Sequence, residues 1–483
     1  MRLIAGLRFL FVPAAALLLA ACAHRGDDAR TVLQQADQAM GGNGVKTLRY
    51  SGSGSANAFG QAYRPGMPWP RQNLTSFSRL LDYENGALRD EAARTRAEPN
   101  GGGALPLMGT GEQRTTVLMR GTHAWNLAGT TPAAAPLSVD GRIHDLWTSP
   151  HGVVKAALKN NATLRRDGTA SVVSFSEPGR FRASAWIGAD GLVERVESMQ
   201  PNPVLGDTPT VTRYSGYRDF AGVRFPTRIQ QEMGGFPVLD LEVREVQVNA
   251  ASGIDVPAAV AAATERVAAE KVAEGIWFLA GGSHNSVLIE MKDHLIMVES
   301  PLYDGRAQAV LAEARRLVPG KELRYVINSH HHFDHSGGLR TAAAAGATLV
   351  TSDIARPWFE QVLANPNSIS PDALARSGRK ATVTSVDGQR TFTDGERVVQ
   401  VALIQDSVHA QGFLMVWLPR ERLLVEADAY TPAAPNASVP AVVNANHVNL
   451  VQNIERLKLD VDRILPLHGR IVPVAELYNG VRR

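Results

Sequence analysis

The sequence contains a single cysteine, Cys22, among its 483 residues. One cysteine excludes a disulfide framework and a four-cysteine zinc site, and its place near the N-terminus excludes a thiol nucleophile deeper in the chain. An excess of charge of one sign is also missing, because 50 Lys and Arg residues face 47 Asp and Glu residues. Domains that bind nucleic acid carry a large, clustered basic excess, so we expect no nucleic-acid partner.

The N-terminus also lacks an apolar run long enough to span a bilayer. Residues 9–21 form a run of 13 residues that includes Pro13, whereas a spanning helix needs about 20. Arg2 and Arg8 precede this run. A short apolar segment after a basic start is typical of a cleaved export signal and disfavours a helical membrane anchor.

The residues before the cysteine, Leu19-Ala20-Ala21-Cys22, resemble the lipobox of bacterial lipoproteins. The resemblance implies that residues 1–21 are a signal peptide, that Cys22 is acylated, and that residues 22–30 are a lipidated tether. Stable anchoring then comes from more than one acyl chain. Ala23 stands where an aspartate would direct retention, so the resemblance places the anchor on the periplasmic face of the outer membrane of a Gram-negative bacterium.

Residues 31–250 favour a β-rich N-terminal domain. Its first element is predicted to be a helix, capped by Asp27 or Asp28 and ended by Gly41-Gly42. Apolar residues then alternate with polar ones, as over 223–230, which indicates strands with one buried face. Over 239–248 the apolar positions slip by one residue, which predicts a β-bulge near Arg244-Glu245. Residues 181–187 and 192–197 flank Gly188-Ala189-Asp190-Gly191 and predict a hairpin.

This domain shows no spacing typical of metal ligands. We interpret His123, His144 and His151 as surface or core residues, and we expect a helix over 153–159. Curved alternating strands with the sequence Asp219-Phe220-Ala221-Gly222-Val223-Arg224-Phe225-Pro226 resemble the half-barrels of outer-membrane lipoprotein carriers.

Residues 251–274 are predicted to be a linker, with an alanine-rich exposed helix over 257–271. From residue 275 to 483 apolar strands alternate with helical stretches, which indicates a second domain of α/β character. Because few apolar residues lie in the linker, we expect the two domains to separate and a fragment beginning near Lys271 to fold and bind metal alone.

Four candidate metal ligands, His330, His332, Asp334 and His335, lie within six residues in the sequence His330-His331-His332-Phe333-Asp334-His335. The segment follows a strand expected over 323–327 and precedes a helix expected over 339–345. His330 and His332 are two residues apart and point the same way in an extended loop, so His331 should point away. We interpret Gly337 and Gly338 as residues that allow tight curvature before the helix.

The pattern His330-x-His332-x-Asp334-His335 resembles the signature of the metallo-β-lactamase superfamily. The resemblance implies a C-terminal αββα sandwich, with metals at one edge of its two sheets, and three ligands further along the chain. Carried onto this sequence, the ligands of the first metal are His330, His332 and His409, those of the second are Asp334, His335 and His468, and Asp428 bridges the two.

The sequence departs from the family's usual pattern at three places. Ala410 follows the third histidine, Ala427 precedes the bridging aspartate, and Glu299 stands where an early strand commonly ends in aspartate. None of these changes removes a ligand. We interpret His447 as a residue outside the ligand set, and His284 as a candidate substrate contact.

Imidazole and carboxylate ligands suit zinc, and iron or manganese are also compatible with them. Two such ions lower the pKa of a shared water from 15.7 toward roughly 7. The resemblance therefore implies a hydrolase with two zinc ions that uses a metal-bound hydroxide, which Asp334 orients. An ester, lactone, amide or related bond of a small periplasmic molecule would fit such a site.

Two alternatives remain at this stage. One is a β-lactamase with an all-histidine first metal site, although such enzymes usually lack an aspartate like Asp428. The other is a lipid or lipoprotein carrier with a non-catalytic C-terminal domain, although the ligand set is complete. The substrate, the native metal, the role of the N-terminal domain and the oligomeric state stay open.

Overall fold

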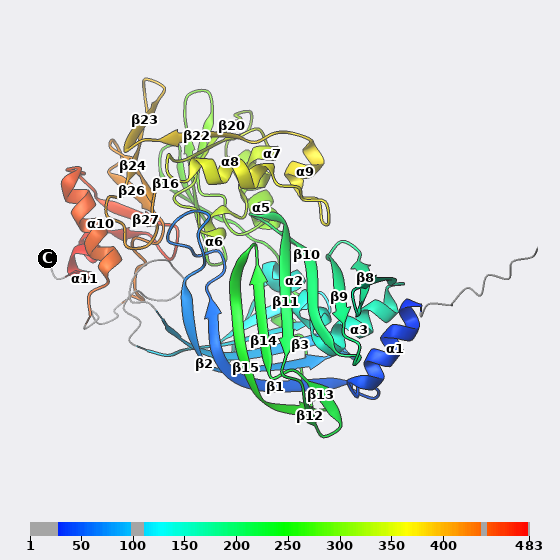
Figure 1. The fold of residues 1–483 in the computed structure, drawn as a ribbon. Helices are drawn as coiled ribbons and strands as arrows, with labels where there is room; N and C mark the ends of the chain where they lie inside the picture. The colour runs from blue at the N-terminus through cyan, green and yellow to red at the C-terminus, as the bar shows by residue number, and fades with distance from the viewer. Residues whose placement is uncertain (1–27, 98–110, 436–441, 482–483) are drawn as a thin grey trace, which may run out of the picture.

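The computed structural model describes residues 28–97, 111–435 and 442–481. The chain forms an N-terminal half built on one large curved sheet and a C-terminal half built on two smaller sheets (Figure 1). Cys22, the signal peptide and the start of the tether lie outside the described residues. Within the described residues, no helix has the length and apolar character needed to cross a membrane.

The N-terminal half begins with helix α1 (Ala29–Ala39), which confirms the predicted first helix. Asp28 caps it by accepting a hydrogen bond from the Thr31 amide at 2.7 Å. The helix buries Val32, Leu33 and Ala36 on one face. Helices α2 (Val139–Thr148) and α3 (Pro150–Lys159) follow later; the second contains the predicted helix, whereas the first was not predicted.

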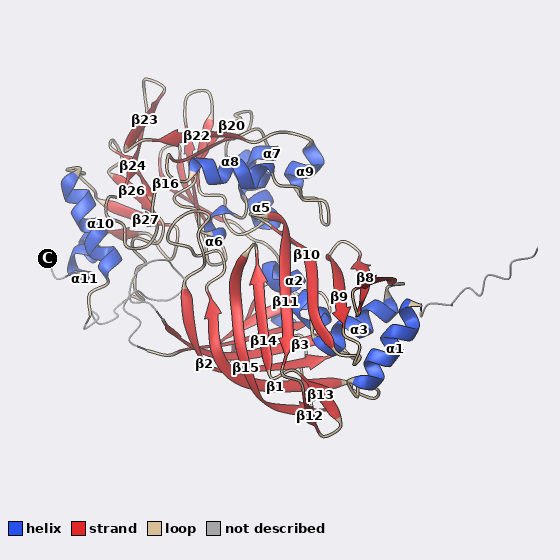
Figure 2. Ribbon diagram, in the orientation of Figure 1, coloured by secondary structure: helices blue, strands red, loops and turns tan. Residues whose placement is uncertain are grey.

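A 13-stranded antiparallel sheet carries this half, in the order β6-β5-β4-β3-β2-β1-β15-β14-β11-β10-β9-β8-β7. It curves around α2 and α3 (Figure 2). Its strands are β1 (Thr47–Asn57), β2 (Arg71–Asp82), β3 (Ala87–Arg96), β4 (Gln113–Arg120), β5 (His123–Ala128), β6 (Thr131–Ala134), β7 (Thr163–Asp167), β8 (Ala170–Glu177), β9 (Phe181–Ile187), β10 (Val193–Asn202), β11 (Gly206–Ser215), β14 (Arg228–Met233) and β15 (Phe236–Val248). The β-rich character is confirmed, while the likeness to carrier half-barrels stays a prediction.

Two local predictions hold in this sheet and one does not. Ser51 pairs with Glu245 and Gly52 with Val243, so Arg244 is the extra residue of the predicted bulge. Strands β9 and β10 form the predicted hairpin. The alternating run over 223–230, however, is divided between β13 (Val223–Phe225), which pairs with β12 (Arg218–Phe220), and β14. Pro226 lies at the break and has no amide hydrogen for a ladder.

The predicted linker helix over 257–271 is wrong in extent. Only α4 (Ala258–Ala261) is helical, and β16 (Ala268–Ala273) is an edge strand paired with β17 (Ile276–Ala280). Alanine favours helices weakly, and pairing with a neighbouring strand overrides that preference. The C-terminal half therefore begins inside the segment that the sequence indicated as a linker.

The C-terminal half contains a seven-stranded and a six-stranded sheet, each with its strands in chain order. Apolar side chains of both sheets meet in one core between them. The first sheet adds β18 (Ser286–Glu290), β19 (Leu295–Val298), β20 (Leu323–Ile327), β21 (Thr348–Ser352) and β22 (Thr382–Val386); the second consists of β23 (Gln389–Thr393), β24 (Val398–Leu403), β25 (Leu414–Leu418), β26 (Leu423–Glu426), β27 (Arg463–Pro466) and β28 (Val472–Pro473).

Helices cover the outer faces of both sheets. The first sheet packs against α5, α7 and α8, and the second against α10 and α11. The helices of this half are α5 (Asp304–Leu317), α6 (Phe333–Ser336), α7 (Leu339–Ala344), α8 (Arg356–Ala364), α9 (Ala373–Ser377), α10 (Ala445–Arg456) and α11 (Val474–Gly480). The layers run helix, sheet, sheet, helix, which confirms the predicted αββα sandwich.

Within the described residues, hydrogen bonds join the two halves at two places. The loop between β1 and β2 reaches the segment around α6, and the tip between β10 and β11 packs beside the segment after α8. Val204 of that tip belongs to the apolar core of the C-terminal half. The separation of the two halves into independently folding domains stays a prediction.

Candidate metal centre

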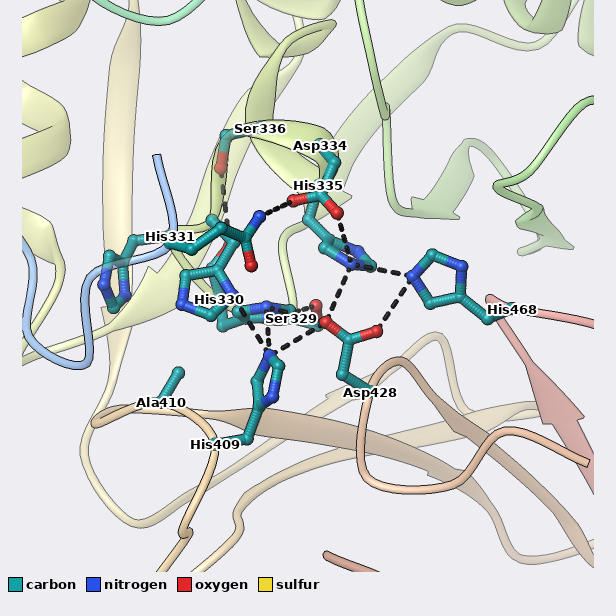
Figure 3. Close-up of polar contacts among 12 residues, drawn as sticks. Ser329, His330, His331, Asp334, His335, Ser336, His409, Ala410, Asp428 and His468 are labelled. Carbon is teal, nitrogen blue, oxygen red and sulfur yellow. Dashed lines mark hydrogen bonds and ion pairs between the residues drawn. The ribbon is translucent and has the colours of Figure 1, made fainter. Parts of the chain in front are cut away.

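The candidate ligands gather at one edge of the C-terminal sandwich, where several strands end (Figure 3). His330 to His335 follow β20 and enter α6, His409 lies between β24 and β25, Asp428 follows β26, and His468 follows β27. Strand ends that meet at one edge bring together residues far apart in the sequence. All seven side chains named from the sequence pattern lie in this one cluster.

The first group consists of His330, His332, His409 and Asp428, whose ligand atoms all lie within 4.8 Å of one another. His409 Nε2 lies 3.2 Å from His330 Nε2 and 3.0 Å from His332 Nδ1. It is also 2.8 Å from Asp428 Oδ2. Both His330 and His332 are fully buried.

The second group consists of His284, Asp334, His335 and His468, again within 4.8 Å. His468 Nε2 lies 3.1 Å from His335 Nε2. Asp428 joins this group too, because its Oδ1 is 2.8 Å from His468 Nε2 and its Oδ2 is 3.2 Å from His335 Nε2. The Asp428 carboxylate therefore lies between the two groups.

The ring contacts fit a pair of bound cations. In a neutral imidazole one nitrogen donates and the other accepts, so two facing ring nitrogens can share only one hydrogen. His409 Nε2 faces two ring nitrogens and a carboxylate oxygen at once. A divalent ion in each group would satisfy all of these lone pairs, and nitrogen and oxygen donors in this number suit zinc.

The outward-facing ring nitrogens are held by neighbouring groups. Glu299, itself fully buried, accepts from His335 Nδ1 at 2.5 Å and also from the Ser329 amide at 2.8 Å. His468 Nδ1 donates to the Ser283 carbonyl at 2.9 Å. Such partners fix the orientation of each ring and leave its other nitrogen free for a metal.

Burial and neighbouring charge set the protonation of the cluster. Burial holds the pKa of His330 and of His332 well below the ordinary value, which keeps both rings neutral. Burial would also lower the pKa of His335, but the carboxylates of Asp428, Asp334 and Glu299 outweigh it and raise that pKa well above normal. Burial would raise the pKa of Asp334 and Asp428, yet the His335 charge holds both well below normal. The two aspartates are thus ionised and His330 and His332 neutral, the forms in which such side chains bind metal.

The histidines that were predicted to lie outside the ligand set are found outside both groups. His331 points away from both groups and donates to the Ala62 carbonyl at 2.8 Å. His447 packs edge-on against Tyr430, outside the ligand groups. His144 and His151 are buried core residues of the N-terminal half, and His123 begins β5.

His284, which the sequence indicated as a candidate substrate contact, lies inside the second group. Its Nε2 is 3.2 Å from Asp334 Oδ2, and its Nδ1 is 2.8 Å from the Ser283 hydroxyl. Its ring is 4.1 Å from that of His468. This side chain therefore contacts the expected ligands of the second site.

Sequence reasoning missed Gln61, whose Nε2 donates to Asp334 Oδ1 at 2.8 Å. Nothing in the local sequence of the β1–β2 loop marks this residue, because its partner lies 273 residues away. Glu299 was noted only as a departure from a pattern. Its place directly after β19, at the same sheet edge as the histidine segment, is a signal that could have identified its role.

Residues 279–466 match the family model described as the metallo-beta-lactamase superfamily. Among solved structures, a metallo-beta-lactamase from Pontibacter korlensis is 14% identical, with a TM-score of 0.35, and the match covers 45% of this chain and 98% of that one. DIM-1 metallo-beta-lactamase is 17% identical, with a TM-score of 0.35, over 45% of this chain and 96% of that one. No curated protein matches the sequence.

Proposed function

We propose that this chain, whose residues 279–466 belong to the metallo-beta-lactamase superfamily, is a hydrolase that uses two zinc ions. The observation that carries the proposal is the position of Asp428 between two groups of buried ligands. Iron or manganese would fit the same donors. Zinc is favoured because the groups are rich in imidazole nitrogen.

The residues divide between the two ions as follows. His330, His332 and His409 would hold the first ion, Asp334, His335 and His468 would hold the second, and Asp428 would serve both. When bound, two such ions supply a water of lowered pKa and polarise the bond to be broken. Asp334, kept ionised by its neighbours, would accept a hydrogen bond from a water held there and orient it.

We propose a small substrate with an ester, lactone, amide or related bond. The described residues include no cysteine. We therefore propose hydrolysis without a covalent thiol intermediate. Through acylated Cys22, the enzyme would face the periplasm from the outer membrane. A β-lactamase with an all-histidine first site is less favoured, because Asp428 contacts the ligands of both groups.

Metal analysis and a substrate panel test this proposal. Protein purified without its signal peptide should contain about two zinc ions per chain by mass spectrometry. It should hydrolyse at least one of a set of ester, lactone, lactam and phosphodiester chromogens. Chelation should abolish that activity and zinc should restore it. Full hydrolysis after exhaustive chelation, with no metal detected, would refute the proposal.

Asp428→Ala is the most informative variant because it removes the contact shared by both groups. We expect it to lower the content of both ions. His409→Ala should deplete the first ion and His468→Ala the second. His447→Ala is the matched control, since this histidine lies nearby but outside both groups, and its metal content should equal that of the wild type.

A further inference from the structure

The loop between β1 and β2, residues 58–70, lies against the metal centre although it belongs to the N-terminal half. We propose that this loop is a functional part of the metal centre, in which Gln61 positions Asp334 and the Ala62 carbonyl positions His332. The inference rests on the proposed function, because it assigns the surroundings of the same metal ligands.

The Ala62 carbonyl fixes the tautomer of His332. Its oxygen is 2.9 Å from His332 Nε2 and 2.8 Å from His331 Nε2. A carbonyl only accepts hydrogen bonds, so His332 must carry its hydrogen on Nε2. Nδ1 is then free of hydrogen, and it is the atom that faces His409 Nε2 at 3.0 Å. The N-terminal half thus determines which nitrogen of His332 is offered to the first ion.

Gln61 acts on the second ion through Asp334. Its side-chain amide donates to Asp334 Oδ1 at 2.8 Å, while His284 Nε2 is 3.2 Å from the other oxygen, Oδ2. A carboxylate held at both oxygens has a fixed plane. Because the glutamine donor is neutral, it orients Asp334 without cancelling the charge that the second ion needs.

The loop is also tied to the segments that carry the ligands. The Phe333 amide donates to the Gly60 carbonyl at 3.2 Å, directly after His332. The Gln411 amide donates to the Tyr63 carbonyl at 2.8 Å, and the Tyr63 hydroxyl donates to the Ser407 carbonyl at 2.8 Å. Ser407 and Gln411 lie two residues on either side of His409. Three hydrogen bonds therefore hold the loop against both segments that carry ligands of the first group.

An aromatic cluster at the base of the loop holds the loop against the segment that carries the metal ligands. Phe59 and Trp69 contact Phe333 with ring centroids 5.2 and 5.4 Å apart. Gly60 has a φ of +80°, and a Cβ there would lie 2.6 Å from the Phe333 ring. Glycine therefore permits the close approach that brings Gln61 and Ala62 to the metal ligands.

Cobalt(II) binding to the full-length mature chain tests the role of Gln61. Cobalt absorption reports ligand geometry in each site without relying on activity. Gln61→Ala should weaken the second ion by roughly 10- to 100-fold, the range known for lost outer partners of metal ligands, and should change its absorption band. Gln61→Glu has the same reach but lacks the donor and adds charge, so it should change the band at least as much.

Met67→Ala is the matched control. Met67 lies in the same loop, is 50% exposed, and has no polar contact with the metal ligands. This variant should bind both ions like the wild type. Gly60→Ala is the second probe, because it pushes the loop from Phe333 and should change the first-ion band through His332. Circular dichroism would show that each variant is folded.

The outcomes separate this inference from the proposed function. If the wild type binds two ions and both Gln61 variants keep its affinity and spectrum, the loop is only packing and the inference is wrong. If the wild type binds no metal, the proposed function fails first. Altered bands in the Gln61 and Gly60 variants together, with an unaltered Met67 variant, would support the inference.

Discussion

Glu299 illustrates how a single residue contributes to the site without being a metal ligand. It is fully buried, its backbone has a φ of +69°, and its carboxylate binds His335 Nδ1, the Ser329 amide and the Ser329 hydroxyl. A left-handed conformation in a non-glycine residue is costly and persists where the surroundings require it. Here the requirement is the orientation of His335.

Glu299→Gln should weaken the second metal ion selectively. The amide keeps the shape of the side chain, but one of its two acceptor atoms becomes a donor, so it cannot serve the donors that now face both oxygens. We expect the affinity for the second ion to fall about 10- to 100-fold, measured by competition with a chromophoric chelator. Glu396→Gln, at an exposed ion pair with Lys292, is the control. Equal affinities in both variants would contradict the role of Glu299.

The buried side chain of His151 makes the stability of the N-terminal half depend on pH in acid. Burial lowers its pKa to about 4 from an ordinary 6.5, so the folded state takes up this proton later than the unfolded state does. Protonation of the unfolded chain therefore destabilises the fold as pH falls below 6.5, and the full cost is reached below pH 4. From the pKa difference, that cost is about 3 kcal/mol.

His151→Leu should remove this part of the acid sensitivity. The Met40 carbonyl keeps a partner in this variant, because the Arg224 amide also donates to it at 3.0 Å. Urea unfolding at pH 7 and pH 4.5 should show a smaller loss of unfolding free energy in His151→Leu than in the wild type. His123→Gln, at a partly exposed histidine, should keep the wild-type slope. Parallel slopes for all three proteins would refute the prediction.

At the scale of elements, Gly337 and Gly338 connect α6 to α7 for a reason other than the one the sequence indicated. Their φ values of −65° and −98° are ordinary, so unusual curvature is not the requirement. A Cβ at Gly337 would lie 1.7 Å from the Leu302 carbonyl oxygen, and one at Gly338 would lie 2.7 Å from the Ser300 oxygen. The glycines allow the segment that carries Asp334 and His335 to pack closely on the loop after β19.

Gly337→Ala should therefore destabilise the C-terminal half. The contacting atoms are backbone and cannot move aside easily, so we expect a loss of about 1–3 kcal/mol or more, measured by urea unfolding. Metal content should fall with it, because the ligand segment shifts. Gly141→Ala is the control: this glycine lies within α2 with open space around it, and alanine there should be neutral or stabilising. A stable, fully metallated Gly337→Ala protein would contradict this account.

Strands with strong apolar runs were predictable, and so was the gathering of the seven candidate ligands in one cluster. The strand over 323–327 was placed residue for residue; it pairs in parallel with β19 and β21, and its last two residues, Val326 and Ile327, are apolar and buried. The structure of the alanine-rich segment was not predicted, because strand β16 forms through its pairing with β17. Such pairing cannot be read from the local sequence.

At the scale of the whole molecule, the unpredicted part is the joining of the two halves. Gln61 and Asp334 are separated by 273 residues, and Leu205 and Asn365 by 160. Contacts of this kind depend on where two folded surfaces meet, which composition and periodicity do not encode. They also bear on the expectation that a fragment from Lys271 folds alone, because such a fragment would lack the β1–β2 loop and would begin inside β16.

The second contact between the halves depends on Asp207. Its carboxylate accepts hydrogen bonds from the Ser368 amide at 2.9 Å, the Ser368 hydroxyl at 2.5 Å and the Ile369 amide at 3.2 Å. Its own amide donates to the Pro366 carbonyl at 2.7 Å. Burial would raise the pKa of Asp207, but the hydrogen bonds from Ser368 outweigh it and lower that pKa. The interaction therefore stabilises the docked halves at neutral pH and weakens as the carboxylate is protonated in acid.

Asp207→Ala should loosen the docking of the two halves at pH 7. Hydrogen bonds to a charged group contribute about 1.5–3 kcal/mol when buried, and partial exposure reduces that here, so we expect a several-fold rise in cleavage between α4 and β16 by limited proteolysis. The effect should shrink in acid below the ordinary aspartate pKa of 3.8, once the pH is low enough to protonate the wild-type carboxylate as well. Asp219→Ala, at an exposed turn in the same half, should be cleaved like the wild type. Identical cleavage of the two variants would mean that the Asp207 carboxylate contributes nothing measurable to the docking of the halves.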